Sequence, residues 1–129
     1  MRNIGVYTTK PVDRDALVEL LREFAAQQAL GWSDPSDPGG QVILTSRSRD
    51  GIYVLKDTAV ANGCVDGQEL EAIKRAIGVS PASYVDLHFT STPGAFPLAD
   101  RLAREIQARW PGVIDYDGAG GGLGTVPRS

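Results

Sequence analysis

Residues that commonly build reaction centres and covalent cross-links are scarce in this sequence. Its 129 residues include one cysteine, Cys64, and one histidine, His88. A single cysteine excludes an internal disulfide, and one histidine with one cysteine leaves a zinc site short of ligands. We therefore expect neither a metal nor another cofactor.

Long hydrophobic segments are missing as well. No apolar run approaches the roughly 20 residues that a membrane-spanning helix needs. Residues 1–6 lead directly into a strand, without the apolar core of a signal peptide. Together with the near-absence of cysteine, these features predict a cytoplasmic protein with no membrane partner.

A surplus of positive charge is also lacking. The 13 Lys and Arg residues are outnumbered by 16 Asp and Glu residues, which gives a net charge of −3. Binding to nucleic acid requires clustered Lys and Arg that neutralise phosphates, and here the basic residues are dispersed along the chain. We therefore expect no nucleic-acid partner.

What is present predicts a single globular domain. Hydrophobic residues make up 42% of the chain and charged residues 22%, proportions that are ordinary for soluble globular proteins. We interpret residues 1–117 as one α+β domain. From Gly118 the sequence is rich in glycine and poor in apolar residues, so residues 118–129 are predicted to form a flexible tail. The glycine spacing does not match a phosphate-binding loop.

Hydrophobic periodicity predicts eight secondary-structure elements. The expected strands are 4–9, 41–46, 52–56, 84–90 and 113–116, the expected helices are 14–30, 67–77 and 95–110, and 32–40 is an expected loop. The first six elements follow the order of the ferredoxin-like split βαβ pattern. We therefore expect a ferredoxin-like βαββαβ core with an additional C-terminal αβ unit, and helices packed on one face of a mixed sheet.

The expected strand 84–90 carries the one candidate for acid–base chemistry. Its residues alternate between an apolar and a polar face, and Asp86 and His88 share the polar face. A carboxylate beside an imidazole orients the ring as a general base requires. The candidate nucleophiles, Thr90 and Cys64 among them, lie in no recognisable motif. A structural role for His88 stays open beside a catalytic one, and Cys64 is either a reactive thiol or a small buried hydrophobe.

Aromatic and acidic residues come together in two segments and favour protein binding. Trp32 lies in the expected loop with Asp34 and Asp37, and Tyr116 and Asp117 lie at the end of the last expected strand. Aromatic side chains are enriched at the centres of protein interfaces. We predict these five residues as partner contacts, with Trp32 either exposed as an anchor or folded back onto the core.

The last third of the chain resembles the immunity proteins of bacterial toxin–immunity systems. The resemblance lies in the strand at 84–89, the Ala-Asp-Arg-Leu-Ala helix at 99–103 and the Ile-Asp-Tyr-Asp-Gly segment at 114–118. It implies a small cytoplasmic protein that binds a cognate toxin and blocks its active site. Immunity proteins share no common binding motif, so the resemblance assigns no functional residues.

We therefore expect a non-enzymatic protein-binding module, an immunity-type inhibitor whose partner is a cognate toxin. Two alternatives remain open. One is a small-molecule-binding regulatory domain that acts as a dimer, since an open sheet face promotes pairing of two copies. The other is a small enzyme that uses His88 and Asp86 as an acid–base pair.

Overall fold

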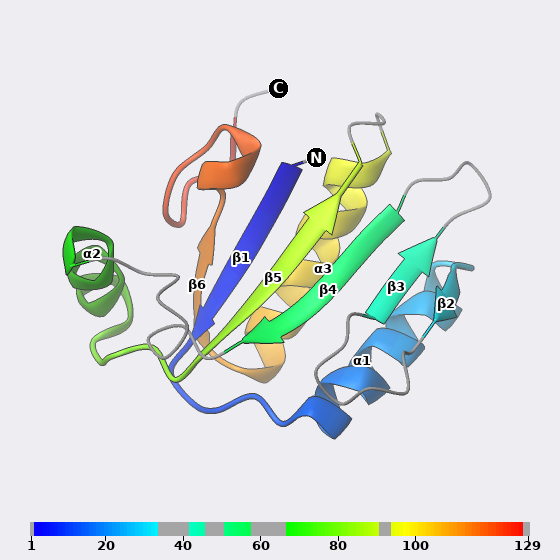
Figure 1. Ribbon diagram of the computed structural model, residues 1–129, viewed down its shortest axis with the longest axis horizontal. Helices are drawn as coiled ribbons and strands as arrows, with labels where there is room; N and C mark the ends of the chain where they lie inside the picture. Colours follow the sequence, from blue (N-terminus) through cyan, green and yellow to red (C-terminus); the bar gives the residue numbers. More distant parts are fainter. Residues whose placement is uncertain (1, 34–41, 46–50, 58–66, 91–93, 128–129) are drawn as a thin grey trace.

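The computed structural model describes residues 2–33, 42–45, 51–57, 67–90 and 94–127 of the chain (Figure 1). Within these residues the protein has an α+β fold of six strands, three α-helices and one short 3-10 helix, η1. In chain order the elements are β1 (Arg2–Thr8), α1 (Arg14–Gln27), β2 (Gly31–Ser33), β3 (Val42–Thr45), β4 (Gly51–Asp57), α2 (Gly67–Ile77), β5 (Ser83–Phe89), α3 (Ala95–Arg109), β6 (Gly112–Asp115) and η1 (Asp117–Ala119).

The strands form one sheet in the order β2-β3-β4-β5-β1-β6. Each pair of neighbours is antiparallel, so the expectation of a mixed sheet is wrong. β1 and β5 lie near the middle and pair along their whole length, from Arg2 opposite Phe89 to Thr8 opposite Ser83. Each has strands on both sides, which gives its backbone donors and acceptors partners in two directions.

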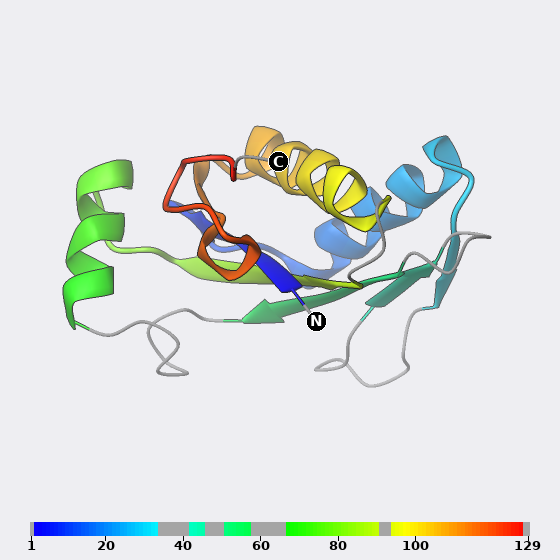
Figure 2. The same cartoon turned by 90° about the horizontal axis from the view of Figure 1, so that it is seen from above.

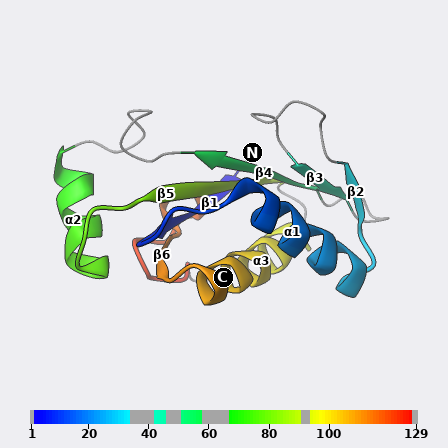
Figure 3. The ribbon, with the colours of Figure 1, turned by 90° about the horizontal axis from the view of Figure 1, so that it is seen from below.

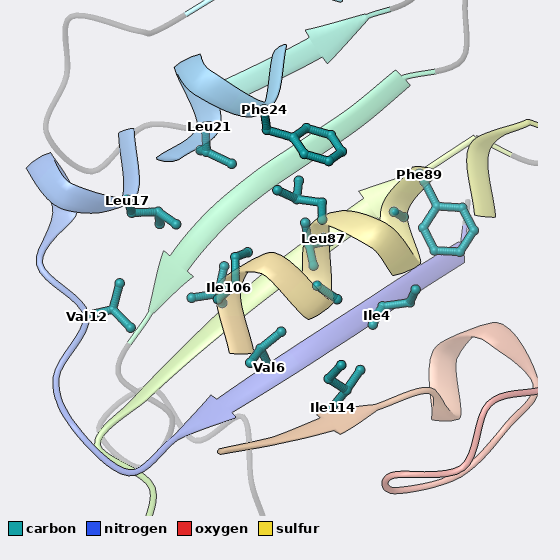
Figure 4. Close-up of a cluster of buried hydrophobic side chains, with 14 of the residues drawn as sticks. Ile4, Val6, Val12, Leu17, Leu21, Phe24, Leu87, Phe89, Ile106 and Ile114 are labelled. Atoms are coloured by element: carbon teal, nitrogen blue, oxygen red, sulfur yellow. The ribbon is translucent and has the colours of Figure 1, made fainter. Parts of the chain in front are cut away.

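The alternation that predicts strand 84–90 is confirmed in β5, where buried and half-buried residues alternate from Ser83 to Phe89. The buried face packs against α1 and α3, which lie on the same side of the sheet (Figure 2). Leu87 of β5, Leu21 of α1 and Ile106 of α3 are fully buried in this layer (Figure 4). No helix among the described residues is long and apolar enough to cross a membrane.

Helix α2 does not join this layer, so the expectation that all helices share one face is wrong. It stands apart from α1 and α3 (Figure 3) and contacts β6. Its one fully buried residue, Ile73, packs with Tyr7 on the opposite face of the sheet, next to the half-buried Tyr84 and Val113. These large apolar groups need cover on their own side of the sheet, and α2 supplies it.

Two boundaries near residue 30 differ from the sequence-based expectation. The helix predicted to reach residue 30 ends at Gln27, and Ala29 adopts a left-handed conformation with φ 55°. The loop predicted at 32–40 begins inside a strand, because Gly31–Ser33 pairs with β3 as β2. Edge pairing with β3 thus overrides the local loop signals.

The expected flexible tail is also wrong for residues 118–127, because this segment folds back onto the domain. Ala119 is buried in the main core. The backbone amide of Gly124 donates to the carbonyl of Ile114 at 2.6 Å, and the amide of Tyr116 donates to the carbonyl of Gly122 at 3.0 Å. The glycine content reflects tight turns here, since Gly120 and Gly124 have positive φ angles.

Candidate functional site

Polar side chains gather on the sheet face opposite α1 and α3, with Asp86 of β5 at their centre. The amide of Asn3 on β1 donates to Oδ1 of Asp86 at 3.2 Å. Nε2 of His88 lies 2.6 Å from Oδ2 of the same carboxylate. The Asp86 side chain is 16% exposed and that of His88 is 37% exposed, so the carboxylate is sheltered and the imidazole reaches solvent.

Tyr84 completes this group on the side nearest α2. Its ring stacks on that of Tyr7, with the ring centroids 4.6 Å apart. It also covers Gly5, where a Cβ atom would lie 2.2 Å from Cε1 of the tyrosine. Burial raises the pKa of the Tyr84 hydroxyl well above its usual range, and the charge of Asp86 raises it further. The hydroxyl therefore stays protonated beside the carboxylate.

The pairing of Asp86 with His88 is the geometry expected from their shared strand face. The carboxylate holds Nε2, so any proton exchange with a second molecule falls to Nδ1. Asn3 restrains the other carboxylate oxygen and keeps Asp86 in place. The arrangement supplies the orienting half of an acid–base unit.

A second polar site lies in a groove where α2, β6 and the C-terminal segment meet. We call this the acidic groove; its volume is about 170 Å³ and its lining residues are Glu69, Ala72, Ile73, Asp115, Asp117 and Leu123. The three carboxylates come from α2, β6 and η1, around apolar side chains. No group of three or more His, Cys, Asp and Glu in the described part of the chain could hold a metal ion.

Asp115 is the most sheltered of the three carboxylates. Burial raises its pKa; the charge of Asp117 adds to this, and a hydrogen bond from the Asp117 amide to Oδ1, 3.0 Å long, acts in the opposite direction. Its ionised form is thus poorly solvated and lies near a second negative charge. A positively charged group in the acidic groove would relieve both effects.

Tyr116, predicted as a partner contact, belongs to the core instead. It is 2% exposed, and its hydroxyl donates to Oδ1 of Asp100 on α3 at 2.5 Å. Burial, together with the hydrogen bond to Asp100 and the charge of that carboxylate, raises the pKa of Tyr116 to about 12. A side chain buried to this extent offers a partner almost no surface, so the prediction for Tyr116 is corrected.

The other predicted contacts differ in how far the structure describes them. Asp117 is exposed and lines the acidic groove. Trp32 lies in β2, where its backbone pairs with Leu44, but its side chain is outside the described part of the structure. Asp34, Asp37 and Cys64 fall outside the described residues altogether.

Two site residues carry no signal in the sequence. Asn3 reaches Asp86 only because β1 and β5 pair with Asn3 opposite His88. Glu69 joins Asp115 and Asp117 only because α2 packs beside β6. In both cases strand pairing or helix packing brings together residues that are far apart in the chain. No local sequence pattern indicates these contacts.

Comparison with known proteins identifies no relative of this chain. No family model matches it, no curated protein matches it and no solved structure matches it. Any assignment of function therefore rests on the residues and the geometry described above.

Proposed function

We propose that this protein is a non-enzymatic protein-binding module, an immunity-type inhibitor that binds a cognate bacterial toxin in the cytoplasm. The observation that carries the proposal is the acidic groove. Its carboxylates, Glu69, Asp115 and Asp117, surround the apolar side chains of Ile73 and Leu123. Such a surface is complementary to an arginine or lysine, which combines an apolar stem with a cationic end.

The charge of the acidic groove suits a toxin whose own substrate cleft is basic. Complementary charge speeds the encounter of two proteins and disfavours wrong partners. A cationic side chain would also stabilise the ionised form of Asp115, whose pKa burial raises. Binding of such a side chain would thus remove the electrostatic penalty that ionised Asp115 carries in the unbound protein.

The size of the acidic groove favours a protein partner over a metabolite. Sites for small molecules usually enclose about 300–1,000 Å³, whereas this groove holds about 170 Å³. That volume accommodates one protruding side chain of a larger surface.

A toxicity assay tests the proposal. A candidate toxin, sought among the products of the genes next to that of this protein, is expressed with the wild-type chain or with the double variant Asp115→Asn/Asp117→Asn, and its affinity for each chain is measured alongside. We expect wild-type protection and at least a tenfold loss of affinity in the double variant, because two charges facing the partner are removed. The matched control is Asp15→Asn, an exposed carboxylate in the first turn of α1, which should protect fully. Equal protection by all three chains would contradict the proposal.

A second candidate function, a small enzyme with an acid–base pair, is favoured by the 2.6 Å contact between His88 and Asp86. General acid–base catalysis typically contributes 10²–10⁴-fold to a rate. If a reaction is found in a substrate panel, His88→Ala should lower kcat by that order, and Asp86→Asn should lower it to a smaller extent, because the imidazole loses the carboxylate that orients it. A reaction rate that both variants leave unchanged would exclude the pair as its catalyst.

We infer that four of the strands, β1, β4, β5 and β6, form a ferredoxin-like core. The inference is supported by their spatial order, β4-β5-β1-β6, in which α3 joins two parallel strands, β5 and β6, with β1 between them. The additions to such a core are then β2, β3 and α2, and not a C-terminal αβ unit. One wall of the acidic groove is thereby an insertion, the kind of segment on which specific binding surfaces commonly lie.

A further inference from the structure

The outer edge of β6 is covered by the chain's own C-terminal segment. Residues 121–127, which we call the C-terminal cap, form a tight turn in which Gly122 and Thr125 exchange backbone hydrogen bonds of 3.1 and 3.2 Å. The cap meets β6 through an antiparallel bridge between Leu123 and Asp115. β6 thus has β1 on one side and the C-terminal cap on the other.

The attachment of the C-terminal cap to β6 is short. Two backbone hydrogen bonds flank the bridge, from Gly124 to the carbonyl of Ile114 and from Tyr116 to the carbonyl of Gly122. Two large apolar side chains of the cap lie near β6: Leu123 is half-buried in the small cluster around Tyr7, and the exposed Val126 lines a shallow groove beside Val113 and Ile114. Few contacts hold the cap, so it belongs to the segments that open locally at low cost.

The residues just before the C-terminal cap are anchored much more firmly. Ala119 is 2% exposed in the main core, and its carbonyl accepts a hydrogen bond from the guanidinium of Arg2. Tyr116 is buried and bonded to Asp100. The boundary between core and cap therefore lies near Gly120, and the cap can leave β6 while the core stays intact.

We propose that the C-terminal cap blocks strand addition at β6 and that, once the cap is displaced, this edge pairs with β6 of a second copy of the chain. An uncovered edge strand presents unpaired backbone groups to other chains. Displacement of the cap would free the carbonyl of Ile114 and the amide of Tyr116 for such pairing. The C-terminal cap thus prevents a further strand from pairing with the outer edge of β6.

The sequence of β6 is suited to pairing with itself. An antiparallel pair centred on Val113 places Gly112 of one copy opposite Ile114 of the other, and the two-fold axis makes both halves equivalent. The two Asp115 residues then lie at opposite ends of the pair. Like charges directly opposite each other, which destabilise a sheet, are thus avoided.

Sedimentation of the isolated protein, with no partner present, tests this inference. The full chain should sediment as a monomer of 13.7 kDa. A chain that ends at Gly120 lacks the C-terminal cap and should show about twice the mass of its monomer at high protein concentration. Gly124→Pro should do the same, because it removes the amide that donates to Ile114 and excludes the φ of +71° that the turn requires. Gly122→Ala, a change within the cap where an added Cβ would lie 3.9 Å from Cβ of Thr125, is the matched control and should stay monomeric.

Hydrogen exchange then locates the contact. In the shortened chain the Ile114 amide should exchange at least tenfold more slowly at high than at low protein concentration. A folded monomer for both the shortened chain and Gly124→Pro would overturn the proposal, as would a dimer without this protection at Ile114. Loss of the native circular dichroism in both variants would also overturn it, because the segment would then be part of the core. None of these outcomes depends on toxin binding, which the assay of protection measures separately.

Discussion

At the scale of single residues, Gly5 shows how one absent side chain shapes the polar face of the sheet. The ring of Tyr84 lies where a Cβ atom at position 5 would be, and from there it stacks on Tyr7. The same placement sets the Tyr84 hydroxyl beside Asp86, where burial keeps it protonated. A glycine in a strand interior normally weakens the strand, and a close approach of this kind explains its presence.

Gly5→Ala is therefore expected to destabilise the protein by about 1–3 kcal/mol, the usual cost of overpacking a buried position. The added Cβ would lie 2.2 Å from Cε1 of Tyr84 and force the ring to move. The change would be measured as a lower midpoint of urea unfolding.

The matched control is Gly67→Ala at the start of α2, where an added Cβ meets nothing within 4 Å. It should be neutral or slightly stabilising, because alanine has a higher helix propensity than glycine. The double variant Gly5→Ala/Tyr84→Ala should lose less stability than the sum of its single changes, since the clash is gone. Strict additivity would show that the ring is not what excludes alanine at position 5.

At the scale of elements, α2 is the helix with the fewest ties to the rest of the protein. Ile73 is its one fully buried side chain, and Leu70 and Ile77 are half-buried. In contrast, α3 buries five residues in the main core. Because α2 carries Glu69 and Ile73, the acidic groove keeps its shape only while this helix stays docked.

Ile73→Ala should undock α2 more readily than it unfolds the sheet. The loss of a fully buried isoleucine costs about 2–5 kcal/mol, and here most of that loss falls on one helix. We expect the amides of α2 to exchange with solvent at least tenfold faster, while those of β1 and β5 change little. Val79→Ala, at a residue that is 50% exposed, should leave α2 unchanged. Uniformly faster exchange across the sheet would instead assign Ile73 to the global core.

At the scale of the whole molecule, the net charge of −3 hides an uneven distribution. Carboxylates on the helices lie near arginines, as in the pairs Arg22 with Glu19 and Arg104 with Asp100. In the acidic groove, Asp115 and Asp117 repel each other. Repulsion between neighbouring acidic groups, which lowers stability, is typical of binding sites.

Asp115→Asn should therefore stabilise the unbound protein near pH 7. Burial raises the pKa of Asp115 in the folded state, so folding favours its protonated form, and that advantage is lost as the pH rises through the folded pKa. Asparagine stays neutral and avoids the loss. We expect a gain of about 0.5–1 kcal/mol, measured by urea unfolding, that shrinks as the pH falls through the raised pKa of folded Asp115 and is gone below about 4, the ordinary pKa of an aspartate. Asp15→Asn is the control and should bring no gain; an Asp115→Asn gain independent of pH would contradict this explanation.

Local sequence patterns anticipated the α+β class and most of the elements, because periodicity reports which face of each segment is buried. They anticipated the alternation of β5 and the meeting of Asp86 with His88, since both lie on one strand. They misplaced Tyr116, because a tyrosine next to acidic residues looks the same whether its ring is buried or exposed. They also misjudged residues 118–127, because glycine is common in flexible tails and in tight turns alike.

The sequence by itself determined the helices, every described strand except β2, and the polar face of β5, since these depend on neighbours within a few residues. The tertiary structure alone decided that α2 packs on the second face of the sheet, that the C-terminal cap covers β6, and that Glu69 joins Asp115 and Asp117. Each of these depends on contacts between residues far apart in the chain. Such contacts are selected by the shape and burial of whole surfaces, which no short segment encodes.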